Sequence, residues 1–161
     1  MKLGIPKPRA AKLQAAILGQ FRRLKAWIEE SLAYGRKYGF CHTWWDGQDF
    51  RRRPLPDLGS AIDSIRESAE RSTWNTRVQG TASEFTLQSI IRMQKALELG
   101  RLPAKQILTV YDSILWEVEE SAADDLIGTA GEVMVDFNTC GVPLKVDFKK
   151  GYSWGDMQKV A

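Results

Sequence analysis

One acidic residue, Asp112, stands between two runs of strand-forming residues. Ile107 to Val110 precede it, and Ser113 begins a second run in which apolar side chains alternate. This pattern predicts a β-hairpin that carries Tyr111 and Asp112 at its tip. A carboxylate offers the hard oxygen ligands that Mg²⁺ requires. Judged on the hairpin alone, Asp112 is more simply explained as a turn residue, because aspartate is common in turns.

A second set of polar residues, Arg71, Asn75 and Gln79, recurs every four positions. This spacing places them on one face if the helix is continuous. Arginine suits phosphates, and amide side chains suit the acceptors that every base pair shows in the minor groove. The alternative is that Arg71 forms a surface ion pair with Glu67 or Glu70, and that the two amides serve helix capping or turns.

Three consecutive arginines, Arg51, Arg52 and Arg53, follow the aromatic stretch Phe40–Trp45 and the turn pair Asp46–Gly47. Aromatic residues before Asp-Gly predict a second hairpin, and the prolines that follow the arginines mark an exposed edge. The arginines suit phosphate binding. They also suit a solvated edge strand whose charge discourages aggregation.

These segments resemble the family A DNA polymerases. Glu70–Ala82 is similar to the palm segment E-R-x-x-x-N-x-x-x-Q-G-T-A of that family, and Val110–Ser113 stands where its V-H-D-E hairpin is expected. Arg51–Arg53 and Leu55–Leu58 match a further R-R-R and L-P-D-L. The resemblance runs from roughly Gly4 to Trp154, which is almost all of this chain but only the last part of such a polymerase.

The resemblance implies roles for the polar residues. Asp112 would be one of two aspartates that hold two Mg²⁺ ions, which activate the primer hydroxyl and stabilise the leaving pyrophosphate. Arg71, Asn75 and Gln79 would face the primer–template, and deoxynucleoside triphosphates would be the substrates. The chain departs from the family at Tyr111, which replaces a histidine that helps to place the primer end, and at Ser113, which replaces a glutamate. Tyrosine can donate a hydrogen bond and stack but carries no positive charge, and serine removes a negative one.

Two further segments of the family are missing from this sequence. These are D-Y-S-x-I-E-x-R, which supplies the other metal-binding aspartate, and R-x-x-x-K-x-x-x-x-x-x-Y-G, a helix that grips the incoming nucleotide. One carboxylate cannot build a two-metal site, so the isolated chain should not polymerise DNA. The chain begins with Met and stops where the family stops. We therefore expect the C-terminal part of a split polymerase, as in some phage genomes, that works with an N-terminal polypeptide. A non-catalytic DNA-binding or scaffold module is one alternative, and a degenerate, poorly folding remnant of a polymerase is another.

Composition sets broad limits. The 161 residues suffice for one domain with a core, and a formal charge of +3 permits nucleic-acid binding without arguing for it. Cys41 and Cys140 are far apart and, with His42 as the single histidine, predict free thiols rather than a zinc site. The sequence shows neither a membrane span nor a signal peptide. We expect a cytoplasmic protein of a bacterium or a phage-infected host.

The periodicity predicts an α+β fold in which a small antiparallel palm sheet, formed by the central hairpin and a C-terminal strand, packs on helices. Residues 1–57 would form a helical arm and a basic hairpin, and residues 58–161 the C-terminal palm portion. Apolar spacing predicts the following elements: helices over 9–19, up to Gly39, from Leu58 to Ala69 and from Gln79 to Leu99, a break near Thr73–Thr76, a hairpin over 105–118, a helix from Ser121, and a strand over 142–148.

Overall fold

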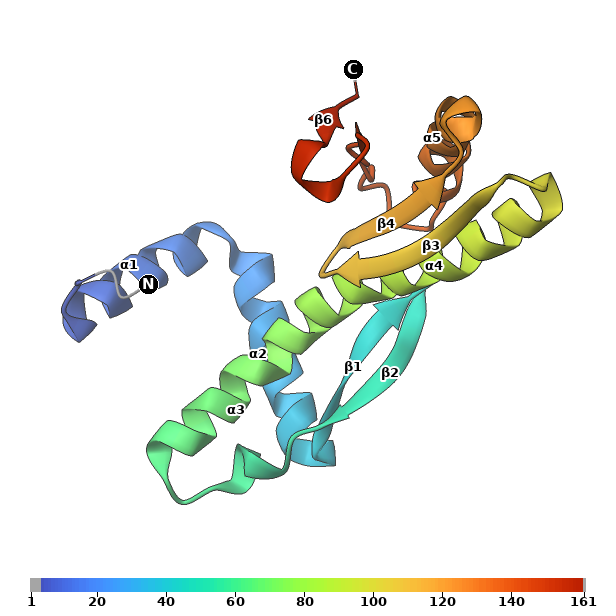
Figure 1. Ribbon diagram of the computed structural model, residues 1–161. Helices are drawn as coiled ribbons and strands as arrows, with labels where there is room; N and C mark the ends of the chain where they lie inside the picture. The colour runs from blue at the N-terminus through green and yellow to red at the C-terminus, as the bar shows by residue number, and fades with distance from the viewer. Residues whose placement is uncertain (1–3, 161) are drawn as a thin grey trace. The chain divides into compact units, whose positions relative to one another are not determined.

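The computed structural model describes residues 4–160 and has the α+β fold that the sequence predicts, with small two-stranded sheets beside helices (Figure 1). The chain divides into two compact units. The first unit comprises the described residues up to Thr43 together with Arg51–Val78, and the second comprises Trp44–Phe50 and the residues from Gln79 onward. The division predicted from the sequence, into an arm with a basic hairpin over residues 1–57 and a palm portion over residues 58–161, stays a prediction.

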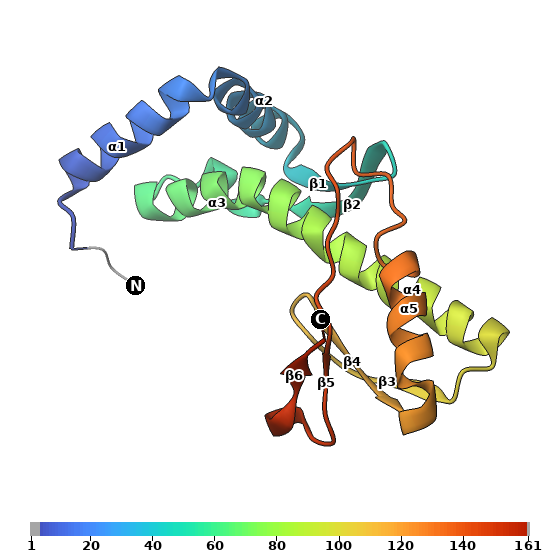
Figure 2. The same cartoon turned by 90° about the horizontal axis from the view of Figure 1, so that it is seen from above.

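The first unit begins with two helices joined at Phe21, which has φ −109° and ψ 68° (Figure 2). Gly39 ends the second helix in the left-handed conformation, as predicted from its position after Arg36 and Lys37. A hairpin and a third helix follow. The elements are α1 (Lys7–Gln20), α2 (Arg22–Tyr38), β1 (Phe40–Trp45), β2 (Gln48–Pro54) and α3 (Asp63–Asn75).

The core of the first unit lies where α2, α3 and the short 3₁₀ turn Pro56–Gly59 meet. It contains Cys41, Leu55, Leu58 and Ala69. Gly35 lets α2 lie close to α3, because a Cβ at position 35 would lie 3.0 Å from a methyl group of Thr73 on α3. Burial raises the pKa of the Cys41 thiol, so Cys41 stays protonated at neutral pH.

The second unit is built around the long helix α4 (Thr81–Gly100), against which the central hairpin and α5 (Ala123–Val133) pack (Figure 1). Its core contains Met93, Leu97, Leu126 and Ala130. The hairpin strands β3 (Ala104–Val110) and β4 (Ser113–Val118) match the predicted range closely. None of the helices formed by residues 4–160 is both long and apolar enough to cross a membrane.

The predicted helix break near Thr73–Thr76 is wrong. The helical assignment runs from α3 through a π-helical turn, Thr76–Gly80, into α4. Thr73 is accommodated because its hydroxyl donates a 2.9 Å hydrogen bond to the carbonyl oxygen of Ala69, one turn earlier. The π turn, which holds one more residue than an α-helical turn, therefore lies just after the position where a break was predicted.

The predicted strand over residues 142–148, and with it a third strand beside the central hairpin, is also wrong. Residues 142–148 have no regular secondary structure. The C-terminal strands are β5 (Lys149–Lys150) and β6 (Gln158–Lys159), which pair only with each other. Phe148 instead packs against the core of the second unit, where its ring lies beside Gly131.

Candidate metal and nucleic-acid site

The central hairpin presents Tyr111 and Asp112 as its two turn residues, because Val110 pairs directly with Ser113. Asp112 is exposed, and the side chain of Tyr111 is 97% exposed. Tyr111 has φ 55°, a left-handed conformation that bulky side chains rarely adopt. The structure therefore confirms the predicted hairpin and places a carboxylate and an aromatic ring in solvent at its tip.

The base of the hairpin is anchored to α4 and to the core of the second unit, to which the hairpin itself belongs. The amide nitrogen Nε2 of Gln106 donates a 2.9 Å hydrogen bond to the carbonyl oxygen of Ile90 on α4, and Trp116 packs against the core. The ladder is irregular between Gln106 and Leu108, so Ile107 forms a β-bulge. A bulge increases the local twist of a hairpin and so changes the direction in which its tip points.

The carboxylate of Asp112 is a suitable oxygen ligand for Mg²⁺, but it stands alone. Within residues 4–160, no group of three His, Cys, Asp or Glu side chains is arranged to hold a metal ion. The described residues do not by themselves fit a two-metal centre, which needs a second source of carboxylates.

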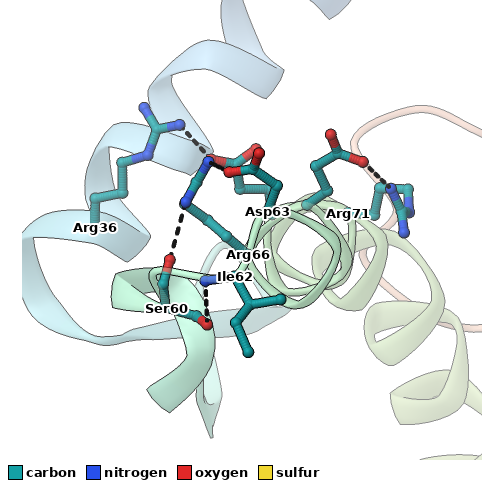
Figure 3. Close-up of polar contacts among 8 residues, drawn as sticks. Arg36, Ser60, Ile62, Asp63, Arg66 and Arg71 are labelled. Atoms are coloured by element: carbon teal, nitrogen blue, oxygen red, sulfur yellow. Dashed lines mark hydrogen bonds and ion pairs between the residues drawn. The ribbon is translucent and has the colours of Figure 1, made fainter.

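Arg71 and Asn75 lie one turn apart on α3, in the first unit. Arg71 forms an ion pair with Glu67 at 3.8 Å, and both side chains are more than 60% exposed. Figure 3 draws Arg71 with a dashed line to its partner. Glu70 is engaged elsewhere, since one of its carboxylate oxygens lies 2.5 Å from a guanidinium nitrogen of Arg36. An exposed pair of this kind contributes only ~0.2–1 kcal/mol, so the Arg71 guanidinium can exchange Glu67 for a phosphate.

Gln79, the third residue of this set, lies in the π turn and in the second unit. Its side chain is exposed, and its carbonyl oxygen accepts a 3.1 Å hydrogen bond from the hydroxyl of Ser83. The spacing of four residues therefore does not continue on a regular α-helix from Asn75 to Gln79. That Arg71, Asn75 and Gln79 act as one DNA-facing set remains a prediction.

The triple arginine lies on β2, where every residue is exposed. All three arginines have contacts within the first unit. The guanidinium of Arg52 lies 5.0 Å from the centre of the Phe40 ring, and Nη1 of Arg53 donates a 2.6 Å hydrogen bond to the buried hydroxyl of Thr76. The backbone amide of Arg51 donates to the hydroxyl of Thr43. Sequence reasoning missed this structural use, because nothing in the sequence links Arg53 to Thr76.

The model of the family "DNA polymerase family A" matches residues 1–156, which is almost the whole chain. The chain belongs to DNA polymerase family A. Among its relatives in that family is the thermostable DNA polymerase I of Thermus caldophilus, 34% identical over 154 residues that are 95% of this chain. The DNA polymerase I of Bacillus subtilis is also 34% identical over 154 residues, or 96% of this chain.

The chain spans 18% of the Thermus polymerase and 17% of the Bacillus polymerase, less than a fifth of either family A relative. A solved structure is also covered only in part. The POL domain of M. smegmatis Pol1, in complex with DNA primer–template and dNTP, is similar with a TM-score of 0.78 and 28% identity over 89% of this chain, but only 25% of that chain is covered. Most of the fold around this segment in family A is therefore supplied by other residues.

Proposed function

We propose that this chain is the C-terminal part of a template-directed DNA polymerase that needs a complementary polypeptide for activity. By complementary polypeptide we mean one from the same genome that carries the D-Y-S-x-I-E-x-R segment and the nucleotide-binding helix. The observation that carries this proposal is the exposed Asp112 at a hairpin tip, in a family A chain that spans less than a fifth of its relatives. We expect it to act in the cytoplasm of a bacterium or of a phage-infected cell.

The role proposed for Asp112 is to contribute one metal ligand. In the assembled enzyme, two Mg²⁺ ions would lower the barrier for attack of the primer hydroxyl and departure of pyrophosphate. Asp112 fits because its carboxylate is free of the core and accessible from solvent. Arg71, Asn75 and Gln79 are proposed to contact the primer–template, and Arg51, Arg52 and Arg53 to contact phosphates. The last three lie on β2, where every residue is exposed.

Tyr111 and Ser113 are proposed to act beside Asp112. The ring of Tyr111 projects into solvent at the tip, where it can stack on the primer-terminal nucleotide and donate a hydrogen bond from its hydroxyl. Ser113 is exposed and begins β4. Its hydroxyl can bind a water molecule that would occupy part of the volume of a longer acidic side chain.

Primer extension with Mg²⁺ tests the proposal. The full chain is mixed with the complementary polypeptide, and each is also assayed alone. We expect extension only with both polypeptides and a loss of at least ~100-fold with Asp112→Asn, which keeps the shape of the side chain but removes its charge. Asp125→Asn, an exposed aspartate on α5, serves as the matched control. Extension that is unchanged by Asp112→Asn contradicts the proposal.

A second function, a non-catalytic DNA-binding or scaffold module, is favoured by one observation. Ser113 removes a carboxylate beside Asp112, and the described residues contain no group of metal ligands. This function predicts DNA binding that weakens with salt and does not depend on Asp112. Binding without extension, in the presence of the complementary polypeptide, would support it over the polymerase.

A further inference from the structure

The N-terminal arm, which we define as residues 7–25, exposes an unusual amount of apolar side chain. Of the described side chains on α1, all are exposed except Leu18, which is half-buried. Four large apolar residues recur at intervals of three or four positions along the arm and are 44–57% exposed: Leu13, Ile17, Phe21 and Leu24. Leu13 and Ile17 lie one turn apart on α1, whereas Phe21 lies at the junction with α2, and we call the four residues together the apolar stripe. Exposed apolar side chains that gather along one segment are typical of a surface that contacts another protein.

The helix α1 also lacks the contacts that normally stabilise a helix of its length. It has 14 residues, and isolated helices of that length are only marginally stable in water. Helices in proteins gain most of their stability by packing an apolar face, and the main packing partner of α1 among the described residues is α2. A partner on the exposed stripe would supply the missing burial.

Charge is distributed very unevenly between the N-terminal 25 residues, which include the arm, and the rest of the chain. Seven of the 23 basic residues precede residue 26, and all 20 acidic residues follow it. Residues 26–161 therefore carry a formal charge of −4, whereas the N-terminal 25 residues carry +7. Two arms of the same kind would repel each other, so pairing of the arms of two copies of this chain is disfavoured.

We propose that the N-terminal arm is the docking surface for the complementary polypeptide, which would present an apolar patch rimmed by aspartate and glutamate. The inference rests on the proposed function. A nucleic acid would neutralise the positive charge of the arm but would leave the apolar stripe in water. A protein patch with an acidic rim would both neutralise the charge and bury the apolar side chains. The relatives support a large occupant, since more than four fifths of their length lies outside the matched segment, and the proposed complementary polypeptide would correspond to part of that length.

Binding of the full chain to the complementary polypeptide tests this surface. Ile17→Ser removes an exposed apolar side chain of the arm, and Leu99→Ser, at an 86% exposed position on α4, is its matched control. Arg23→Glu reverses a charge in the arm, and Lys95→Glu, also exposed on a helix, is the control. We expect each arm variant to weaken the complex by about tenfold or more, and each control by less than about threefold.

Hydrogen exchange gives a second readout that does not depend on a variant. Amides of residues 7–20 should exchange quickly in the free chain and become protected when the complementary polypeptide binds. Far-UV circular dichroism and urea unfolding of each variant exclude loss of folding as the cause of weaker binding. Normal binding by both arm variants, or unchanged exchange over residues 7–20, would overturn the inference.

The outcomes separate this inference from the proposed function. If the arm variants assemble normally and extension still depends on Asp112, the polymerase role stands and the docking surface is wrong. If Arg23→Glu weakens binding to primer–template but not to the complementary polypeptide, the arm is a nucleic-acid surface and the inference is wrong. If the unmodified chain does not bind the complementary polypeptide at all, both the docking surface and the two-polypeptide enzyme are contradicted.

Discussion

Tyr111 combines an aromatic side chain with a left-handed backbone, which is costly for every residue except glycine. Asparagine or glycine would form the same turn with less strain. The retention of an aromatic ring at a fully exposed position therefore argues that the ring serves a ligand rather than the fold. This is the pattern expected where local strain is kept for function.

We predict that Tyr111→Gly raises the free energy of unfolding by about 1 kcal/mol, because glycine adopts a positive φ without steric cost. The same change should lower primer extension, since it removes the ring and the hydroxyl beside Asp112. Urea unfolding and extension assays with the complementary polypeptide measure the two effects. A glycine variant that is more stable and fully active would show that the ring has no role with DNA.

The site residues differ in how far the sequence could locate them. The exposed tip at Asp112 followed from local alternation alone, because a two-residue turn and its flanking strands are short-range features. The contact between Arg53 and Thr76 could not be predicted, because it joins residues 23 positions apart through packing of the first unit. The uneven charge of the arm was visible in the sequence, as the absence of acidic residues before Glu29, but was missed when only the net charge was considered.

At the scale of elements, the π turn at Thr76–Gly80 shows why helix propensities alone predicted a helix break wrongly. A run of β-branched and polar residues argued for a helix break, but Thr73 and Thr76 are both buried, and each hydroxyl has a hydrogen-bond partner in the first unit. The strand predicted over residues 142–148 failed for a related reason. Its alternating apolar residues, of which Phe148 is one, have no neighbouring strand there to pair with.

The bond from Arg53 to Thr76 makes a prediction about α3 and the π turn. Thr76→Val keeps the shape of the side chain but removes the acceptor of a partly buried charged donor, so it should lower the free energy of unfolding by about 1–3 kcal/mol. Thr109→Val, exposed on β3, should change it by less than about 0.5 kcal/mol. Equal stability of the two variants, measured by urea unfolding, would show that the bond contributes nothing.

At the scale of the whole molecule, residues 4–160 form two small cores, each with four buried apolar residues. Cores of this size stabilise a domain only modestly, and large apolar side chains remain on the surface. Both features are expected of a segment that folds as part of a larger protein. They agree with a chain that covers 18% of the length of its Thermus relative.

Mass action then predicts how stability depends on the complementary polypeptide. A partner that binds only the folded chain should raise the free energy of unfolding by about 2.7 kcal/mol at a free concentration 100 times its Kd. Asp112→Asn should leave this gain unchanged, whereas Ile17→Ser should reduce it at the same concentration. Thermal unfolding of the mixtures, followed by a label on this chain, measures the gain. A midpoint that does not move with partner concentration would contradict assembly.

Because of the β-bulge at Ile107, the direction in which the Asp112 carboxylate points can be changed without substituting Asp112 itself. Deleting Ile107 would leave the pairs Gln106–Trp116 and Leu108–Leu115 in register and remove only the extra twist between them. The shortened chain should still unfold cooperatively, yet extension should fall by about 100-fold, because a displacement of about 1 Å is enough to spoil a reacting geometry. A single extra residue, five positions before Asp112 in the same hairpin, would then set the direction of the carboxylate without taking part in the reaction itself.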